Sequence, residues 1–229
     1  MYASKDIALV ETIRDLCRVC YTCVRECPAK AIRIADGQAE VIPERCIGCG
    51  NCVCVCSQRA KRVARSIETV EALLADEKPV AACIAPSFPA EFAECDAGHF
   101  AGMLRALGFA KVTEVGFGAD LVADRYRRLV KSGDGRRYIA TTCPAVVAYV
   151  ERYHPDLVGS LAPVVSPMIA QARALRELYG DDLRVVFVGP CIAKKGEIHG
   201  PEVAGDVNAA LTFAELREML GTRNVLPAS

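Results

Sequence analysis

The 229-residue chain lacks an excess of charge of either sign, a long apolar run and an export signal. Lysine plus arginine and aspartate plus glutamate both number 28, so nothing in the charge favours nucleic acid or an anionic membrane surface as a partner. Runs such as VVFVGPCIA are much shorter than the roughly 20 apolar residues of a membrane-spanning helix. The N-terminal stretch carries Lys5, Asp6 and Glu11 and has no apolar signal-peptide segment. We therefore expect a soluble cytoplasmic protein without a membrane span.

Two common kinds of ligand site are also missing from the sequence. Gly116 and Gly118 do not form a GxGxxG loop, so a nucleotide site has no support. The three histidines, His99, His154 and His199, lie far apart without metal-ligand spacing. Neither nucleotide binding nor a histidine metal site is therefore expected.

Cysteine, by contrast, is abundant. Nine of the 13 cysteines lie between Cys17 and Cys56. The odd total, the CxxC spacing and the missing export signal argue against disulfides, which leaves metal binding. Eight of the nine form two runs of equal spacing, Cys17-x2-Cys20-x2-Cys23-x3-Cys27-Pro28 and Cys46-x2-Cys49-x2-Cys52-x3-Cys56, and Cys54 is expected to be a small packed side chain.

This spacing is that of bacterial two-cluster 4Fe–4S ferredoxins, in which the fourth cysteine of a run binds the other cluster. One cluster would then be held by Cys17, Cys20, Cys23 and Cys56, and the other by Cys46, Cys49, Cys52 and Cys27. Structural zinc is the alternative, but the third cysteine of each run and Pro28 have no purpose in a zinc ribbon. Between the runs, segments 31–34 and 39–42 flank an Asp-Gly turn signal and predict a β-hairpin.

Beyond residue 62 the pattern changes to alternating helical and strand-like segments. Residues 66–78 have apolar positions at helical spacing after Ser66, a suitable N-cap. Continuous apolar runs predict buried strands within 79–86, 111–117, 137–143 and 183–190, and amphipathic helices are expected between and after them. The predicted fold is an α+β two-cluster ferredoxin domain at 1–62, a connecting helix at 63–78 and an α/β domain with a mostly parallel sheet at 79–229.

Several segments in the second part occur in an order that resembles one family. They are LGFAKVTEVGFGADL (107–121), TTCPAVVAYVERYHPDL (141–157), LAPVVSPM (161–168), GPCIAKKGEI (189–198) and LTFAELREML (211–220). Together they are similar to the first part of the large subunit of iron-only (di-iron) hydrogenases, whose N-terminal extensions commonly carry ferredoxin domains. The resemblance covers roughly residues 10 to 220.

The resemblance implies roles for four residues. In that family, an active-site cubane joined to a di-iron unit is held by four cysteines, and Cys143 and Cys191 correspond to two of them. Lys194 corresponds to a lysine that contacts a cyanide ligand, and Glu197 to a glutamate of a proton route. Purely structural roles are the alternative. Cys143 and Cys191 could be ordinary buried cysteines at strand ends, and Lys194, Lys195 and Glu197 could form a solvated helix face.

The chain also departs from the family pattern. The family has a proton-donating cysteine before the first ligand cysteine, where this chain has Thr142, whose hydroxyl is far too weak an acid for that task. The motif that supplies the other two ligands, ExMxCxxGC, does not occur before Ser229. A third cubane or di-iron site at Cys143 and Cys191 is therefore expected only if a second chain or a missing C-terminal segment supplies further ligands.

Three functions remain open. The first is an iron–sulfur redox protein that transfers single electrons to a redox partner such as a ferredoxin, in a sensory or electron-transfer role with weak or no hydrogen turnover. The second is a truncated hydrogenase that oxidises hydrogen or reduces protons. The third is a non-catalytic assembly factor, because eukaryotic hydrogenase-like proteins of iron–sulfur assembly also have a single cysteine before proline.

Overall fold

The computed structural model describes residues 7–133 and 135–225, which form two compact units. Unit 1 comprises residues up to 64 together with 143–161 and 191–202, and unit 2 comprises 65–142, 162–190 and the residues from 203 onward. Two late segments therefore fold with the cysteine runs. The division at residues 62 and 78 stays a prediction. The two compact units differ from it chiefly because residues 143–161 and 191–202 belong to unit 1.

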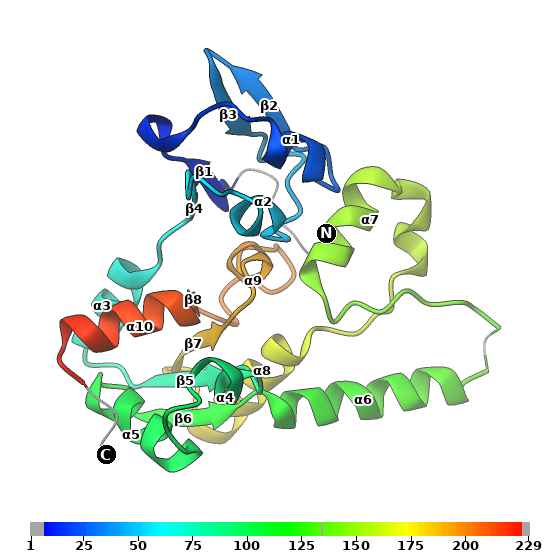
Figure 1. Cartoon of the computed structure of the whole chain (residues 1–229). Helices are drawn as coiled ribbons and strands as arrows, with labels where there is room; N and C mark the ends of the chain where they lie inside the picture. Colours follow the sequence, from blue (N-terminus) through cyan, green and yellow to red (C-terminus); the bar gives the residue numbers. More distant parts are fainter. Residues whose placement is uncertain (1–6, 134, 226–229) are drawn as a thin grey trace. The chain divides into compact units, whose positions relative to one another are not determined.

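The N-terminal part of unit 1 consists of short elements around the cysteine runs (Figure 1). The antiparallel hairpin of β2 (Ile32–Ala35) and β3 (Gln38–Val41) has the predicted Asp-Gly turn, in which Asp36 and Gly37 both have positive φ. A second antiparallel pair joins β1 (Val10–Thr12) to β4 (Lys61–Val63). The remaining elements are a 3-10 helix at Arg14–Leu16, α1 (Thr22–Glu26) and α2 (Asn51–Cys54).

The later segments of unit 1 complete its core. They form α7 (Pro144–Tyr153), a 3-10 helix at Pro155–Ser160 and α9 (Ala193–Glu197). Ala148 of α7 is buried in one cluster with Cys23, Cys27 and Ile32, and Tyr149 and Tyr153 pack against it. The small apolar core of the cysteine-rich region is thus closed by a helix that lies about 100 residues later in the chain.

Unit 2 is built on a parallel four-stranded sheet with the order β6-β5-β7-β8. Its strands are β5 (Val80–Ile84), β6 (Lys111–Glu114), β7 (Arg184–Gly189) and β8 (Ala209–Thr212). Every residue of β5 is buried, as expected for a strand covered on both faces. The sheet and the ferredoxin-like hairpin together confirm the predicted fold class.

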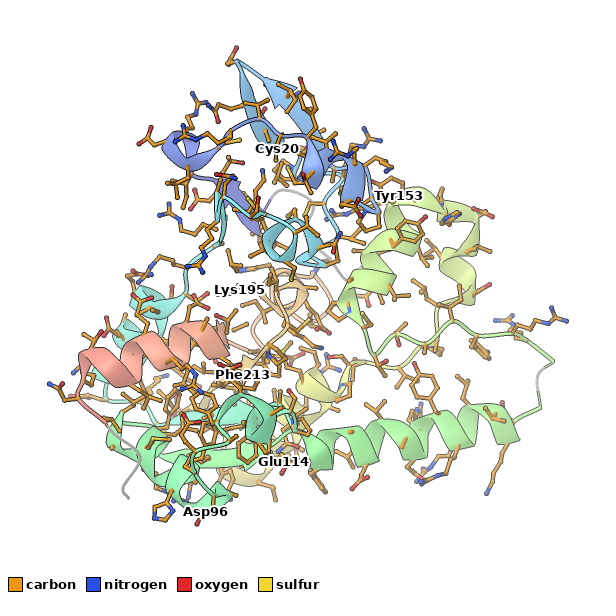
Figure 2. The ribbon with its side chains drawn as sticks, in the orientation of Figure 1. Cys20, Asp96, Glu114, Tyr153, Lys195 and Phe213 are labelled. Carbon is orange, nitrogen blue, oxygen red and sulfur yellow. The ribbon has the colours of Figure 1, made fainter. Side chains whose placement is uncertain are left out.

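The helices of unit 2 follow the amphipathic segments of the sequence (Figure 1). α8 (Pro167–Tyr179) packs against β5 and α6 (Gly116–Lys131), while α10 (Phe213–Thr222) packs against β7, β8 and α3 (Ile67–Ala75). Two further helices, α4 (Phe88–Glu91) and α5 (Ala97–Ala106), bring Phe88 and Phe92 onto Phe100. Figure 2 shows the Phe213 side chain of α10 in this region, where its ring meets Phe92 edge-on at 5.7 Å.

Two sequence expectations are wrong in unit 2. Residues 137–143 do not form a strand: the Ile139 carbonyl accepts a hydrogen bond from the Ala162 N–H at 2.9 Å in an isolated bridge, and the Thr141 N–H donates to the Tyr126 hydroxyl at 2.8 Å and not to a neighbouring strand. Strand β8 was not expected, since its four residues run directly into α10. Within the described residues, no helix has both the length and the apolar character that crossing a membrane requires.

Candidate functional site

The eight cysteines of the two runs surround two separate cavities in unit 1. The first is lined by Cys17, Cys20 and Cys23 of the first run and by Cys56 of the second. The second is lined by Cys46, Cys49 and Cys52 of the second run and by Cys27 of the first. The structure thus brings together the four cysteines of each predicted set, with the fourth cysteine of each run at the other cavity.

Backbone amides donate to the sulfur of three of these cysteines. The N–H of Ala31 donates to Cys27 Sγ at 3.3 Å, that of Ala60 to Cys56 Sγ at 3.3 Å, and that of Gly48 to Cys46 Sγ at 3.5 Å. Such donors stabilise a thiolate, the form in which cysteine binds iron. Thiols gathered round a cavity with amide donors fit the ligand set of a 4Fe–4S cluster.

Burial differs among the thiols within each set. Hydrogen bonding to the Thr22 hydroxyl lowers the pKa of Cys20, which is exposed. In the second set, burial raises the pKa of Cys46 and raises that of Cys52 to about 12. Burial likewise raises the pKa of Cys23 in the first set, and each set contains one exposed thiol, Cys20 or Cys49. In both sets, binding a positively charged metal must therefore offset the cost of deprotonating the buried thiols.

Two glycines lie in the loop of the second cysteine run, residues 46–50, which is called the second loop below. They allow segments from both ends of the chain to approach it. Gly48 and Gly50 have φ values of +70° and +78°. A Cβ at Gly48 would lie 2.9 Å from Leu9 Cδ1 and 3.0 Å from Ala193 Cα, and one at Gly50 would lie 2.8 Å from Ile192 Cδ1. The second loop is thus packed tightly beneath the segment that follows Cys191.

α7 holds the same loop by polar contacts that the sequence did not predict. The Arg152 guanidinium donates to the Pro43 carbonyl at 3.0 Å and to the Cys46 carbonyl. The Tyr153 hydroxyl is within 2.5 Å of the Ala29 carbonyl and 2.9 Å of the Arg45 carbonyl, and Figure 2 shows this side chain at the end of α7. In the sequence, an arginine and a tyrosine at the end of an amphipathic helix look like surface residues, so the pattern could not predict these contacts.

Cys143 and Cys191 lie in unit 1 with the two cavities, at the starts of two helices that pack together. Cys143 is the N-cap of α7, and Cys191 precedes α9 by two residues. Cys143 is exposed and Cys191 is half-buried, so neither is an ordinary core cysteine, and no strand precedes Cys143. Cys54 is also exposed, contrary to expectation.

Lys194 and Glu197 form a buried ion pair on α9. Lys194 Nζ lies 2.6 Å from Glu197 Oε2, and the two residues are 7% and 4% exposed. Lys195 is buried too, so the alternative of a solvated helix face is wrong for all three residues. A paired ammonium and carboxylate inside the protein can donate hydrogen bonds to an anionic ligand and hold a proton.

Among the described residues, no group of three or more His, Cys, Asp or Glu side chains is arranged to hold a single metal ion.

A buried lysine, Lys61, lines the first cavity, and the sequence pattern did not predict it. The alternation of β4 places it inward with Val63, but a lysine in a three-residue strand resembles a surface residue in sequence.

The fold and the two cysteine-lined cavities define a protein with a ferredoxin-like region joined to a parallel α/β unit. The family model of the iron-only hydrogenase large subunit, C-terminal domain, matches residues 78–229, and that of the 4Fe-4S dicluster domain matches residues 9–57. The chain therefore belongs to the iron-only hydrogenase large-subunit family and carries a 4Fe–4S dicluster domain, which confirms the resemblance seen in the sequence.

Individual relatives agree with this assignment. The periplasmic [Fe] hydrogenase large subunit of Nitratidesulfovibrio vulgaris is 36% identical over 89% of this chain and 55% of its own length. Iron hydrogenase 1 of Clostridium pasteurianum is 31% identical over 65% of this chain and 30% of its own. The cytosolic Fe–S cluster assembly factor NAR1 of Yarrowia lipolytica is 28% identical over 63% and 33% of the two chains.

A solved [FeFe]-hydrogenase structure, HydA(deltaEFG), shares the fold with a TM-score of 0.62 at 24% identity, covering 71% of this chain and 48% of that one. The chain spans between about a third and just over half of the length of the curated relatives described above.

Proposed function

We propose that this chain is an iron–sulfur redox protein that holds two 4Fe–4S clusters and passes single electrons on a hydrogenase-type scaffold. The observation that carries the proposal is the arrangement of the eight cysteines around two cavities, four at each. When bound, each cluster supplies one-electron chemistry. Cys17, Cys20, Cys23 and Cys56 would hold the first cluster, and Cys27, Cys46, Cys49 and Cys52 the second.

The cavity geometry favours clusters over zinc. A tetrahedral zinc site holds four sulfurs about 2.3 Å from one ion, so the sulfurs converge on a point. Here the four thiols of each set line a cavity, amides donate to Cys27, Cys46 and Cys56, and among the described residues no three or more metal-binding side chains are arranged around a single ion. Four thiols around a cavity suit a cubane, which is larger than an ion.

The first cluster is the proposed entry point for electrons from a carrier protein such as a ferredoxin. Cys20 is exposed, and the neighbouring Tyr21 and Leu16 side chains are 50% and 43% exposed (Figure 2 shows Cys20). Exposed aromatic and aliphatic side chains beside a redox centre give a partner an apolar contact.

The second cluster would connect the first to the region of Cys143 and Cys191. Gly50, next to Cys49, packs against Ile192, next to Cys191. We propose that Cys143 and Cys191 contribute two ligands to a third centre whose other ligands come from outside residues 7–225. Lys194 would donate hydrogen bonds to an anionic ligand there, and Glu197 would hold or release a proton.

Hydrogen conversion is the second candidate activity, and the buried Lys194–Glu197 pair favours it. Thr142 stands where the family has a proton-donating cysteine, so we propose weak or no hydrogen turnover and a sensory or electron-transfer role. In a host that assembles hydrogenase clusters, hydrogen evolution and uptake are measured for the full-length protein and for Thr142→Cys. Vigorous turnover by the natural sequence would overturn the weak-turnover proposal, whereas activity gained only with Thr142→Cys would support it.

The cluster proposal is tested on anaerobically purified protein. We expect about eight irons and eight acid-labile sulfides per chain, and after reduction an EPR spectrum of two interacting clusters. Protein that contains zinc and no sulfide, or that is colourless and free of iron, would overturn the proposal.

A further inference from the structure

Lys61 is a buried lysine that has no carboxylate partner among the described residues. It is 6% exposed, and its Nζ donates to the Thr12 hydroxyl at 2.5 Å and to the Ala39 carbonyl at 2.9 Å. The Thr12 hydroxyl donates in turn to the same carbonyl. Across the residues that the structure describes, no Asp or Glu lies within ion-pair distance of Lys61, so an ammonium charge sits in the unit without a neutralising carboxylate.

This position lies next to both sets of cysteines. Lys61 is five residues beyond Cys56 and lines the first cavity with the four cysteines of the first set. The carbonyl that its Nζ contacts belongs to Ala39, which is buried in one core cluster with Cys23 of the first set and Cys27 of the second. The field of one ammonium therefore extends to both cavities.

An unpaired buried ammonium is costly, because its desolvation is not repaid by an opposite charge. An aliphatic side chain at this inward position of β4 would pack without that cost. The chain nevertheless places lysine there and supplies two oxygen acceptors for it. Such an arrangement is expected where a nearby group carries negative charge when the protein is loaded.

Resting on the two-cluster function proposed above, we propose that Lys61 is an electrostatic tuning residue that raises the reduction potential of both 4Fe–4S clusters. One-electron reduction takes a cubane with its four thiolates from a net charge of about −2 to −3. A fixed cation stabilises the more negative state more strongly, and burial limits screening by salt. The electron comes from the carrier protein or from a chemical reductant, and no bond is made or broken.

The test compares Lys61→Met with Arg62→Met in the iron-loaded protein, by anaerobic EPR-monitored redox titration. Both variants remove one positive charge, but Arg62 is exposed and paired with Glu11 at 2.8 Å. At a fixed potential of the solution, we expect Lys61→Met to lower the reduced-to-oxidised ratio of both clusters about tenfold, a shift of about 59 mV for a one-electron couple. We expect Arg62→Met to change the ratio less than twofold and Lys61→Arg to restore it.

Salt provides a second measurement. The effect of Lys61→Met should persist at about 1 M salt, where exposed charges are screened within roughly 3 Å. Unchanged potentials in Lys61→Met, or equal shifts in Lys61→Met and Arg62→Met, would overturn the inference while leaving the two-cluster function intact. Loss of iron from Lys61→Met alone would also overturn it, because the ammonium would then be needed for assembly and not for tuning. Absence of iron from the natural protein would overturn both.

Discussion

The two cysteine runs have the same spacing but different surroundings. The loop of the first run is open to solvent: Cys20 is exposed, and the adjacent Tyr21 is half-exposed. The loop of the second run also exposes its Cys49, but its glycines pack closely against Leu9 and the segment before α9, and Arg152 of α7 donates to its backbone. An identical ligand pattern can therefore serve two environments, and the covering segments determine which environment each cluster has.

This contrast suits a chain of electron transfer. A cluster in the more open loop can exchange electrons with a separate protein, while one in the more closely packed loop can pass them to the segment packed against it. Burial and hydrogen bonds to sulfur are among the factors that set cluster potentials, so the two clusters are expected to differ in potential despite their equal ligands.

The largest expected effect comes from replacing single cysteine ligands. In the structure the ligand sets are crossed, which means that the fourth cysteine of each run lies at the cavity of the other run. If Cys56 belongs to the first set, Cys56→Ala should resemble Cys20→Ala, although Cys56 lies in the second run. Each should lose about four of eight irons, because one cubane loses a ligand. Cys27→Ala should likewise resemble Cys49→Ala. Iron analysis and EPR of the remaining cluster give the comparison.

An uncrossed arrangement would give the opposite pairing. The spectrum of Cys56→Ala would then match that of Cys49→Ala, and Cys27→Ala would match Cys20→Ala. Because each comparison is between two single-cysteine variants, a general loss of stability would affect both members of a pair and would not mimic a change of partner.

Much of this arrangement could be predicted from the sequence, because ligand spacing is a local property. The cysteine spacing predicts both sets, the Asp-Gly signal predicts the β2–β3 hairpin, and helical periodicity predicts α7 within its observed bounds. Continuous apolar runs likewise predict β5 and β7. Each of these signals is carried by neighbouring residues.

The missed features depend on contacts between distant residues. Lys61 is buried because β4 pairs with β1, about 50 residues earlier, and the tight packing of Gly48 depends on Ala193. Residues 137–143 have an apolar strand-like pattern, yet they make a single bridge at Ile139, and the Thr141 N–H donates to the hydroxyl of Tyr126. Single-sequence patterns do not contain these pairings.

A smaller effect is expected from adding a methyl group at a glycine of the second loop. Gly48→Ala should destabilise the loaded protein by roughly 2–5 kcal/mol, the sum of a strained left-handed backbone and overpacking against Leu9 and Ala193. Gly37 has the same φ of +70° with no atom within 4 Å of the added Cβ, so Gly37→Ala should show only the strain of about 1–2 kcal/mol. Anaerobic thermal unfolding followed by circular dichroism compares them, and equal midpoints would show that the second loop is not tightly covered.

The smallest effect tests how α7 holds the second loop. Tyr153→Phe removes the hydroxyl that donates to the Ala29 and Arg45 carbonyls, and we expect a loss of about 1 kcal/mol, since water can reach these partly exposed groups. Tyr149 is the matched control: its ring stacks on that of Tyr153 at 5.2 Å, and its hydroxyl has no hydrogen bond among the described residues. Tyr149→Phe should leave the unfolding midpoint unchanged. If the two variants behave alike, the Tyr153 hydroxyl contributes nothing to holding the second loop, and of the polar contacts of α7 those of Arg152 remain.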